Sequence, residues 1–462
     1  MKRYFKNIII LLLVLLTFFI TSCVKKTYVV VFDYGYNNII TTQEVKKGDI
    51  ANIPKSPVRD RYNFLGWYLD SNFSNIYDTN TKIYDNTTIY AKWEAINIHH
   101  IILNYNGGVL EEEIPMIEFA DAADVSLPSP TKENYDFDGW YENGNKIEVI
   151  ENRDYVLTAR YNAKYSVVPA LTITPFRTKS EIYQDVTYKI VGGEELKMDI
   201  YLPPLEEGKT SPVLFMYFGG GFMFGDKTLV ANMGGSGILQ EIFDYVLDNN
   251  IAVIIPNYRL SDGLNVTYPL PVEDSLDAIR FCVKNSAALG IDVHNMGTIG
   301  FSAGAYMALM AGFAQDSYFG DPNLKNISYN IKYIVDMFAP SYFDTESLDK
   351  ISFKGKVMLA SFFGSDVFNN TQVFETAFPS YYVNTSKPSV YIVHGEEDPL
   401  VPPSQSQNFY NLLIENGIDA SILFIGGAAH MLGPASGFDQ TSMSLSEIYA
   451  DIASFIMREV NK

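Results

Sequence analysis

The stretch GFSAG, residues 300–304, follows the short apolar segment MGTIGF at 296–301 and precedes a second apolar segment of helical length, AYMALMAGF at 305–313. A G-x-S-x-G pattern alone is a weak signal, but its position between a strand and a helix is the context that the pattern requires. A serine on such a sharp turn exposes its hydroxyl, and the flanking glycines avoid collisions there. Free N–H groups at the start of the helix favour developing negative charge. We therefore predict that Ser302 is a nucleophile, with a buried structural serine as the alternative.

The region around this turn, from about residue 165 onward, alternates short apolar runs with amphipathic stretches of helical length. An antiparallel pair is expected first, at 186–191 and around 197. Interior strands are then expected at 212–218, 251–258, 296–301, 331–338, 389–395 and 420–426. Runs this apolar, separated by helices, are typical of a buried and mostly parallel sheet. Residues 165–462 are therefore predicted to form one α/β domain.

A serine hydroxyl needs a base to accept its proton, and the chain has only five histidines. His99 and His100 lie far upstream, in a different kind of sequence. His294 precedes the strand at 296–301, at the end opposite to the serine, and we expect it to be a solvated loop residue. His394 ends a predicted strand and His430 follows the last one, so both remain candidates at this point.

A glycine-rich stretch, FGGGFMFGD at 218–226, directly follows the predicted strand at 212–218. Three glycines let the backbone approach a substrate closely and turn N–H groups toward it, as an oxyanion hole requires. A flexible glycine turn without a function is the alternative.

Together these segments resemble the hormone-sensitive-lipase-like esterases and the bacterial carboxylesterases of the acetyl- or feruloyl-esterase type, which have the α/β-hydrolase fold. The resemblance implies that His430 is the base, because in this fold the base follows the final strand. The segment HGEEDPLVP, at 394–402, resembles the family pattern H-G-x-x-D-x-x-V-P, which implies that Asp398 orients the imidazole. The competing acids are Glu396, Glu397 and Asp336.

The same resemblance implies that the backbone N–H groups of Gly220, Gly221 and Ala303 form the oxyanion hole. Phe218 stands where the relatives usually have a histidine that supports this loop, so the rigidity of the loop is in question. The implied reaction is hydrolysis of a carboxylic ester through an acyl-enzyme, without a cofactor or a metal ion. Cys282, in an amphipathic helical pattern, is expected to be a core residue.

The N-terminal part contains a repeat: PVRDRYNFLGWYLD at 57–70 aligns with PTKENYDFDGWYEN at 130–143. Each copy is flanked by alternating segments that predict small β units of the ubiquitin-like or grasp type. The pattern resembles the Listeria–Bacteroides, or internalin B-type, repeats of bacterial surface proteins. We therefore expect β-rich repeat domains at 24–95 and 96–163 that act as a spacer, with the GWY aromatics in their cores. A ligand-stacking role of these aromatics is the alternative.

The first residues combine a basic start, MKRYFK, with an apolar run over 8–20 that ends in ITSC. This pattern predicts a secretory signal. It also resembles a bacterial lipoprotein signal, which implies removal of residues 1–22, a lipid on Cys23 and a location on the extracellular face of a bacterial membrane. A plain signal peptide and an uncleaved anchor are the alternatives. A lipidated Cys23 leaves Cys282 without a disulfide partner.

The net charge of −20 argues against nucleic acid as a partner. We expect a small-molecule or glycan ester as substrate, with Phe222, Phe224 and an aromatic-rich insertion at about 340–385 as walls of its pocket. Contacts of the repeats with other cell-surface components are left open, as is the choice of acyl and alcohol groups.

A peptidase of the prolyl-oligopeptidase type and a non-catalytic binding protein remain alternatives. The first usually carries a large gating domain, and the second is expected to have lost one of the three catalytic residues.

Overall fold

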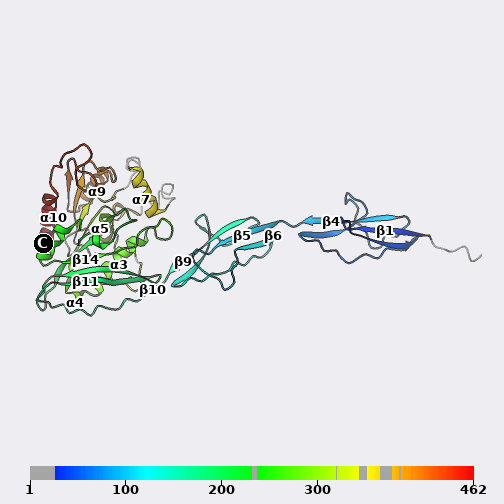
Figure 1. The fold of residues 1–462 in the computed structure, drawn as a ribbon, viewed down its shortest axis with the longest axis horizontal. Coiled ribbons are helices and arrows are strands. Elements are labelled where there is room, and N and C mark those ends of the chain that lie inside the picture. Colours follow the sequence, from blue (N-terminus) through cyan, green and yellow to red (C-terminus); the bar gives the residue numbers. More distant parts are fainter. Residues whose placement is uncertain (1–25, 232–236, 319, 343–350, 365–376, 384–386) are drawn as a thin grey trace, which may run out of the picture. The chain divides into compact units, whose positions relative to one another are not determined.

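The computed structural model describes residues 26–231, 237–318, 320–342, 351–364, 377–383 and 387–462 (Figure 1). The predicted signal peptide and Cys23 lie outside these described residues, as do parts of the predicted insertion at 340–385. Within the described residues, the helices are too short or too polar to cross a lipid bilayer.

The repeat region contains two mixed sheets. The first has the order β2-β1-β4-β3, and the second has the order β6-β5-β9-β7-β8. In each sheet the first and last strands of the repeat lie side by side and run parallel, β1 with β4 and β5 with β9. The strands are β1 (Thr27–Asp33), β2 (Ile40–Lys46), β3 (Tyr62–Tyr68), β4 (Thr87–Ala95), β5 (Ile98–Asn104), β6 (Met116–Ala120), β7 (Tyr135–Glu142), β8 (Asn145–Lys146) and β9 (Tyr155–Ala163).

Each repeat sheet has a small aromatic core of its own. The tryptophans of the two GWY motifs, Trp67 and Trp140, are 6% and 3% exposed. Trp67 packs edge-on against Phe32, with ring centres 5.0 Å apart, and Trp140 packs in the same way against Phe137 at 5.8 Å. The prediction that the GWY aromatics form the cores is confirmed for the two tryptophans, whereas Tyr68 and Tyr141 of the same motifs are half-buried and lie outside these cores.

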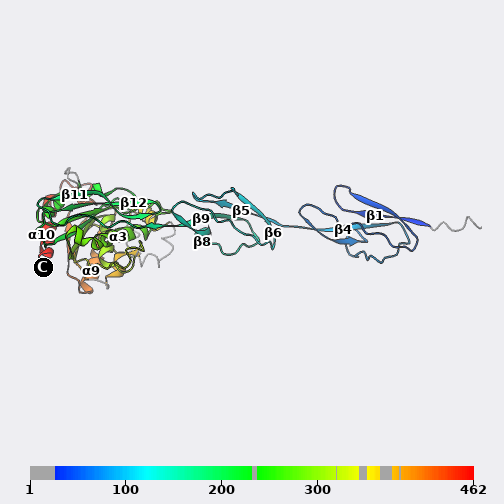
Figure 2. The same cartoon turned by 90° about the horizontal axis from the view of Figure 1, so that it is seen from below.

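The C-terminal unit is built on a nine-stranded sheet with the order β10-β11-β12-β14-β13-β15-β16-β17-β18 (Figures 1 and 2). β11 and β12 form the predicted antiparallel pair, and the six strands from β14 to β18 in this order run parallel to one another. The strands are β10 (Tyr165–Ser166), β11 (Glu181–Val191), β12 (Glu194–Leu202), β13 (Ser211–Tyr217), β14 (Ala252–Pro256), β15 (Ile291–Phe301), β16 (Tyr333–Met337), β17 (Ser389–Gly395) and β18 (Ala420–Ile425).

Helices connect these strands and pack in two groups. α2 contacts α10, while α3 contacts α5, and the rings of Phe313 in α5 and Phe409 in α9 lie 6.0 Å apart. The helices are α2 (Gln240–Asp248), α3 (Leu270–Lys284), α4 (Ser286–Leu289), α5 (Ala303–Phe313), α7 (Phe353–Phe363), α9 (Pro403–Glu415) and α10 (Leu445–Val460), with short 3₁₀ turns η1 (Lys227–Leu229) and η3 (Pro379–Tyr382). This strand order with its connecting helices is the predicted α/β-hydrolase fold.

The sequence explains why α5 lies at the centre of the unit. Every residue of α5 is buried, and its composition is apolar on all sides rather than on one face. Such a helix is stable only when it is covered all round, so it packs against β13, β15 and β16 as well as against other helices. The residue before α5 is thereby fixed at the carboxyl end of β15. Ligand sites of open parallel sheets lie at these carboxyl ends.

Candidate active site

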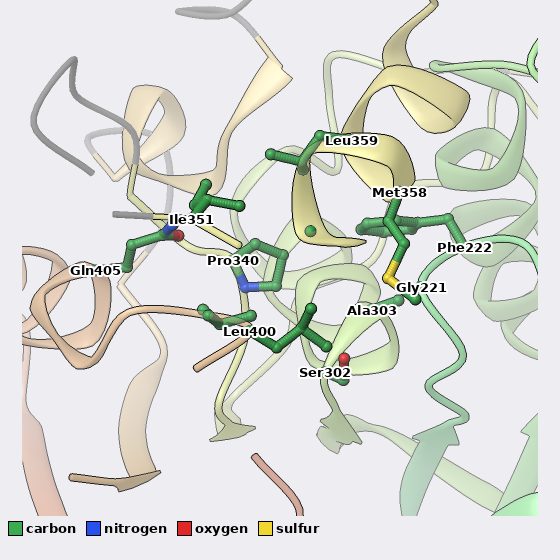
Figure 3. A pocket seen from close by; sticks show the side chains of 12 residues that line it. Gly221, Phe222, Ser302, Ala303, Pro340, Ile351, Met358, Leu359, Leu400 and Gln405 are labelled. Atoms are coloured by element: carbon green, nitrogen blue, oxygen red, sulfur yellow. The ribbon is translucent and has the colours of Figure 1, made fainter. Parts of the chain in front are cut away.

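Ser302 forms the turn between β15 and α5. Its backbone has φ 54° and ψ −125°, a conformation that residues other than glycine rarely adopt. The turn is held by neighbouring backbone: the Ser302 N–H donates to the Met337 carbonyl at 2.9 Å, and the Ser302 carbonyl accepts from Ala305 and Tyr306. The strained turn directs the hydroxyl toward a pocket, where Figure 3 shows it.

The flanking glycines permit close backbone contact at this turn. A Cβ atom on Gly300 would lie 2.3 Å from the backbone of Gly304. A Cβ on Gly304 would lie 2.3 Å from the Tyr217 carbonyl oxygen and 2.4 Å from that of Phe218. The start of α5 therefore rests directly against the end of β13, where the glycine-rich loop begins.

The structure brings the hydroxyl of Ser302, the imidazole of His430 and the carboxylate of Asp398 together. His430 Nε2 lies 2.9 Å from Ser302 Oγ, and His430 Nδ1 lies 2.7 Å from Asp398 Oδ2. Ser302 directly follows β15, Asp398 follows β17, and His430 follows β18, so all three lie at carboxyl ends of parallel strands. The Phe338 and His430 rings pack edge to face, with ring centres 4.9 Å apart.

Four hydrogen bonds surround the Asp398 carboxylate. Oδ1 accepts from the backbone N–H groups of Leu400 and Val401 at 2.8 and 3.0 Å. Oδ2 lies within hydrogen-bond distance of both His430 Nδ1 and His394 Nε2. Burial alone would raise the pKa of Asp398, but the hydrogen bonds from His394 and His430 outweigh burial and hold the pKa well below its usual value. Asp398 is therefore an anion wherever the protein is folded near neutral pH.

His394 is fully buried and packs into the same turn. Its Nε2 lies 3.1 Å from Asp398 Oδ2 and 3.0 Å from the Val401 carbonyl oxygen, both of which are acceptors. Nε2 must therefore carry a proton, and Nδ1 lies within hydrogen-bond distance of the Ser406 hydroxyl, at 2.7 Å. This arrangement gives His394 no contact with Ser302 among the hydrogen bonds of the described residues. It fits the predicted role of shaping the turn.

The competing acids and bases lie elsewhere. Asp336 is buried in β16, where Oδ1 accepts from the Ala339 N–H at 2.9 Å, and burial raises its pKa to about 7. Glu396 and Glu397 are exposed. His294 is exposed as predicted, but it lies within β15 rather than in a loop, because β15 begins at Ile291.

The glycine-rich loop after β13 lies next to Ser302. Gly220 and Gly221 have φ values of 122° and 61°, which side chains disfavour, and both line the space beside the serine. Ala303 is the first residue of α5, so its N–H has no acceptor within the helix. Gly220 and Gly221 thus border one pocket beside Ser302, while Gly221 and Ala303 border a second pocket beside it.

Phe218 is held by aromatic packing where relatives are expected to have a histidine. Its ring is fully buried and stacks on Tyr258 with ring centres 4.3 Å apart and planes 4° from parallel. The Tyr258 hydroxyl also donates to the Phe218 carbonyl at 2.7 Å. The stack and the hydrogen bond therefore fix the start of the glycine-rich loop without a histidine.

Two pockets meet at Ser302. The first holds about 380 Å³ of empty space including its open mouth, and Figure 3 shows the side chains around it. Its lining is almost entirely apolar apart from Ser302 and Gln405. The lining residues are Gly221, Phe222, Ser302, Ala303, Pro340, Ile351, Gly355, Met358, Leu359, Leu400, Val401 and Gln405.

The second pocket holds about 590 Å³ of empty space and contains the His430 side of the site. Phe224 and Met431 line it and are 60% and 46% exposed, so this side is open to solvent. Of the two phenylalanines predicted as pocket walls, Phe222 lines the first pocket and Phe224 the second. In the described part of the predicted insertion, the residues that line the first pocket are aliphatic, such as Met358 and Leu359 of α7, and none of them is aromatic.

Gln405 was not among the residues predicted from the sequence. It shares the buried face of α9 with Phe409 and Leu413, at a spacing of four residues. A glutamine on an apolar helical face is the signal that could have identified it. Among the described residues, no three His, Cys, Asp or Glu side chains lie close enough together to hold a metal ion.

Parts of the chain match known protein families. Residues 198–413 match the BD-FAE family, and residues 28–92 and 99–161 each match the Listeria-Bacteroides repeat domain. The chain thus carries an α/β-hydrolase domain of the BD-FAE esterase family, preceded by two Listeria-Bacteroides repeats.

Individual relatives match parts of the chain. Esterase LipQ of Mycobacterium tuberculosis is 28% identical over 247 residues, which are 53% of this chain and 55% of LipQ. A protein of Evansella cellulosilytica, provisionally named a Gly-rich membrane protein, is 32% identical over 27% of this chain and 14% of its own length. The chain therefore spans about half of LipQ and less of the second relative. The structure of a truncated carbohydrate esterase from gut microbiota is 22% identical, with a TM-score of 0.48, over 62% of this chain and 98% of that chain.

Proposed function

We propose that the protein is a serine carboxylic ester hydrolase that works through Ser302, His430 and Asp398. The observation that carries the proposal is the continuous series of contacts from hydroxyl to imidazole to carboxylate, at 2.9 and 2.7 Å. The match to an esterase family and the similarity to Esterase LipQ support ester hydrolysis.

The first half of the reaction forms an acyl-enzyme. Because Asp398 is an anion that accepts from His430 Nδ1–H, Nε2 presents its lone pair to the Ser302 hydroxyl. Ser302 Oγ attacks the ester carbonyl carbon while Nε2 takes the hydroxyl proton. The carbonyl oxygen becomes an oxyanion that accepts from the N–H groups of Gly220, Gly221 and Ala303. When the carbonyl reforms, the bond to the alcohol oxygen breaks, and the imidazolium gives that oxygen its proton.

The second half releases the acid. A water molecule takes the place of the alcohol and gives a proton to His430 Nε2 as its oxygen attacks the acyl carbon. The same backbone N–H groups hold the second oxyanion. Collapse of this intermediate breaks the bond to Ser302 Oγ, which recovers its proton from His430.

The two pockets receive different parts of the ester. His430 must reach the alcohol oxygen to protonate it, so the alcohol occupies the second pocket, which His430 lines. The first pocket is lined by Ser302, Gly221 and Ala303 but not by His430, so it receives the acyl group. An acyl chain in this pocket contacts an apolar surface, whereas the alcohol lies in open space.

We further propose that the substrate is an acetylated or aryl-esterified carbohydrate at the outer surface of a bacterial cell. An open alcohol side suits a large polar alcohol such as a sugar chain, and the exposed ring of Phe224 offers it a stacking surface. The signal-like start and Cys23 support a lipid anchor, with residues 24–163 as the spacer.

Replacing Cys23 by Ala is expected to abolish labelling by radioactive palmitate in cells and to release the enzyme from the membrane fraction. Retained labelling would contradict the anchor.

The reaction is tested on the soluble protein and its Ser302→Ala variant. The substrates are p-nitrophenyl acetate, butyrate and longer esters, with acetylated xylan and a dipeptide amide in parallel. We expect ester hydrolysis that falls by at least about a thousandfold in the variant. Equal rates for both proteins would overturn the proposal, and preference for the amide would identify a peptidase instead.

A further inference from the structure

Gln405 places an unpaired amide group at the pocket that we assign to the acyl group. The residue is 1% exposed, and neither its side-chain oxygen nor its side-chain nitrogen has a hydrogen-bond partner within the part of the chain that the structure describes. Figure 3 shows the side chain reaching from its helix to the edge of the pocket near Ile351. Leaving a buried polar group unpaired is unfavourable in free energy, because the group has lost its hydrogen bonds to water. A ligand that bonds to the amide would recover this free energy.

Within the described residues, the pocket offers no other side chain that could form a hydrogen bond with the Gln405 amide in place of a ligand. Apart from the Ser302 hydroxyl, which His430 engages, the other side chains that line the pocket are apolar. Several of them come from α7 and from the chain just before it, including Ile351 and Leu359. An acyl group that enters from Ser302 therefore meets a hydrocarbon surface first and the amide of Gln405 at the edge.

Building on the proposed function, we infer that Gln405 selects the acyl group. The preferred acyl group is apolar near the reacting carbonyl and carries one neutral hydrogen-bonding group, a hydroxyl or a carbonyl, further along the chain, so of the two proposed substrate classes it is the aryl ester and not the acetate. The amide offers one acceptor oxygen and two N–H donors, so it can pair with either group. A purely apolar acyl group leaves the amide unpaired, and a charged one finds no counter-charge among the lining residues.

The inference is tested with pairs of esters that differ only in the polar group. The short pair is p-nitrophenyl 4-oxopentanoate and p-nitrophenyl 4-methylpentanoate, which have the same number of heavy atoms. The long pair is p-nitrophenyl (4-hydroxyphenyl)acetate and p-nitrophenyl (4-methylphenyl)acetate. For each pair, the ratio of kcat/KM for the polar ester to that for the apolar ester is measured in the wild type and in Gln405→Met. Because a ratio is measured, general effects of the substitution on folding and on the chemical step cancel.

We expect the wild type to favour the polar ester in at least one pair, and Gln405→Met to lower that ratio by about tenfold. Gln405→Leu provides a second apolar replacement if the Met variant does not fold. Gln407→Met is the matched control, because Gln407 lies two residues further along α9 and bonds to Asn411 outside the pocket. Its ratios are expected to equal those of the wild type.

Ratios that stay within twofold of the wild type in the Gln405 variants, for both pairs, would overturn the inference. A wild type that favours the apolar ester in both pairs would overturn it as well. The Ser302→Ala variant separates this failure from failure of the proposed function. Hydrolysis that is lost in Ser302→Ala but insensitive to Gln405 refutes only the selection by Gln405, whereas hydrolysis that persists in Ser302→Ala refutes the esterase proposal.

Discussion

Asp398 and Asp336 are buried carboxyl groups in the same domain with opposite pKa shifts. Burial would raise the pKa of Asp398, but the hydrogen bonds from the imidazoles of His394 and His430 hold it well below its usual value, so the carboxylate stays charged. Asp336 accepts from one backbone N–H, and its second oxygen has no partner in the described part of the chain. Burial then dominates and raises its pKa to about 7. The two imidazoles beside Asp398, which Asp336 lacks in the described part of the chain, therefore account for the opposite pKa shifts of two buried carboxyl groups.

Asp336 should make folding stability depend on pH. Its folded pKa of about 7 lies above the ordinary value of 3.8, so the folded state binds more protons between these values. The contribution of Asp336 to the free energy of unfolding is therefore fully present below about pH 4, and it is lost as the pH rises through about 7. Asp336→Asn keeps an acceptor for the Ala339 N–H but cannot ionise.

We expect the free energy of unfolding of Asp336→Asn, relative to the wild type, to rise by about 2 kcal/mol between pH 5 and pH 8. Urea unfolding of the catalytic domain at several pH values measures this difference. Asp439→Asn, an exposed substitution in the same domain, is the control. A difference between Asp336→Asn and wild type that does not change with pH would contradict the raised pKa.

The sequence located Ser302, Asp398 and His430 but missed Gln405, for a physical reason. Ser302 is marked by a local pattern, a strand, a tight turn and a helix, whereas Asp398 and His430 were selected by the resemblance to the esterase family. Gln405 matters because α9 and α7 meet around one pocket, and packing between distant segments leaves little trace in local spacing. The sequence also could not show that α7 would line the pocket with Met358 and Leu359.

The loop after β13 is the element whose rigidity the sequence left in question. The Tyr258 ring stacks on Phe218, and the Tyr258 hydroxyl donates to the Phe218 carbonyl one residue before the three glycines. Gly304 lets α5 rest on the same carbonyl region. A strand end, a helix start and one tyrosine thus hold the loop that is proposed to supply the oxyanion hole.

Tyr258→Phe is expected to lower kcat on p-nitrophenyl acetate by about fivefold, with a smaller change in KM. The substitution keeps the ring stack but leaves the buried Phe218 carbonyl without its donor, which costs about 1 kcal/mol and loosens the loop where charge develops. Steady-state kinetics measure the effect, and Tyr245→Phe, a partly exposed tyrosine of α2, is the control. An unchanged kcat would show that the hydrogen bond does not hold the loop.

At the scale of the whole molecule, the chain is a series of separately packed sheets. The cores around Trp67 and Trp140 consist of residues from their own repeats, while the catalytic core is built from residues of the C-terminal unit. The α/β class of the C-terminal domain and the repeat sheets were predicted from local periodicity, with apolar runs in the C-terminal part and alternation in the repeats. The strand order came from resemblance, since periodicity does not determine which strands pair.

Removing residues 1–163 should leave small-ester hydrolysis intact, because the catalytic core does not depend on the repeat cores. We expect kcat/KM on p-nitrophenyl acetate within about twofold of the soluble protein that retains the repeats. Circular dichroism and thermal unfolding of the shortened protein control for folding. A folded but inactive fragment would show that the repeats contribute to the site.

The most direct measurement of the central claim is covalent labelling with a fluorophosphonate, which reacts with an activated serine and mimics the tetrahedral intermediate. Peptide mapping by mass spectrometry should find one label per chain, on Ser302, and His430→Ala should slow labelling by at least about a hundredfold. A label on another residue, or an unlabelled Ser302 in protein that still hydrolyses esters, would contradict the account.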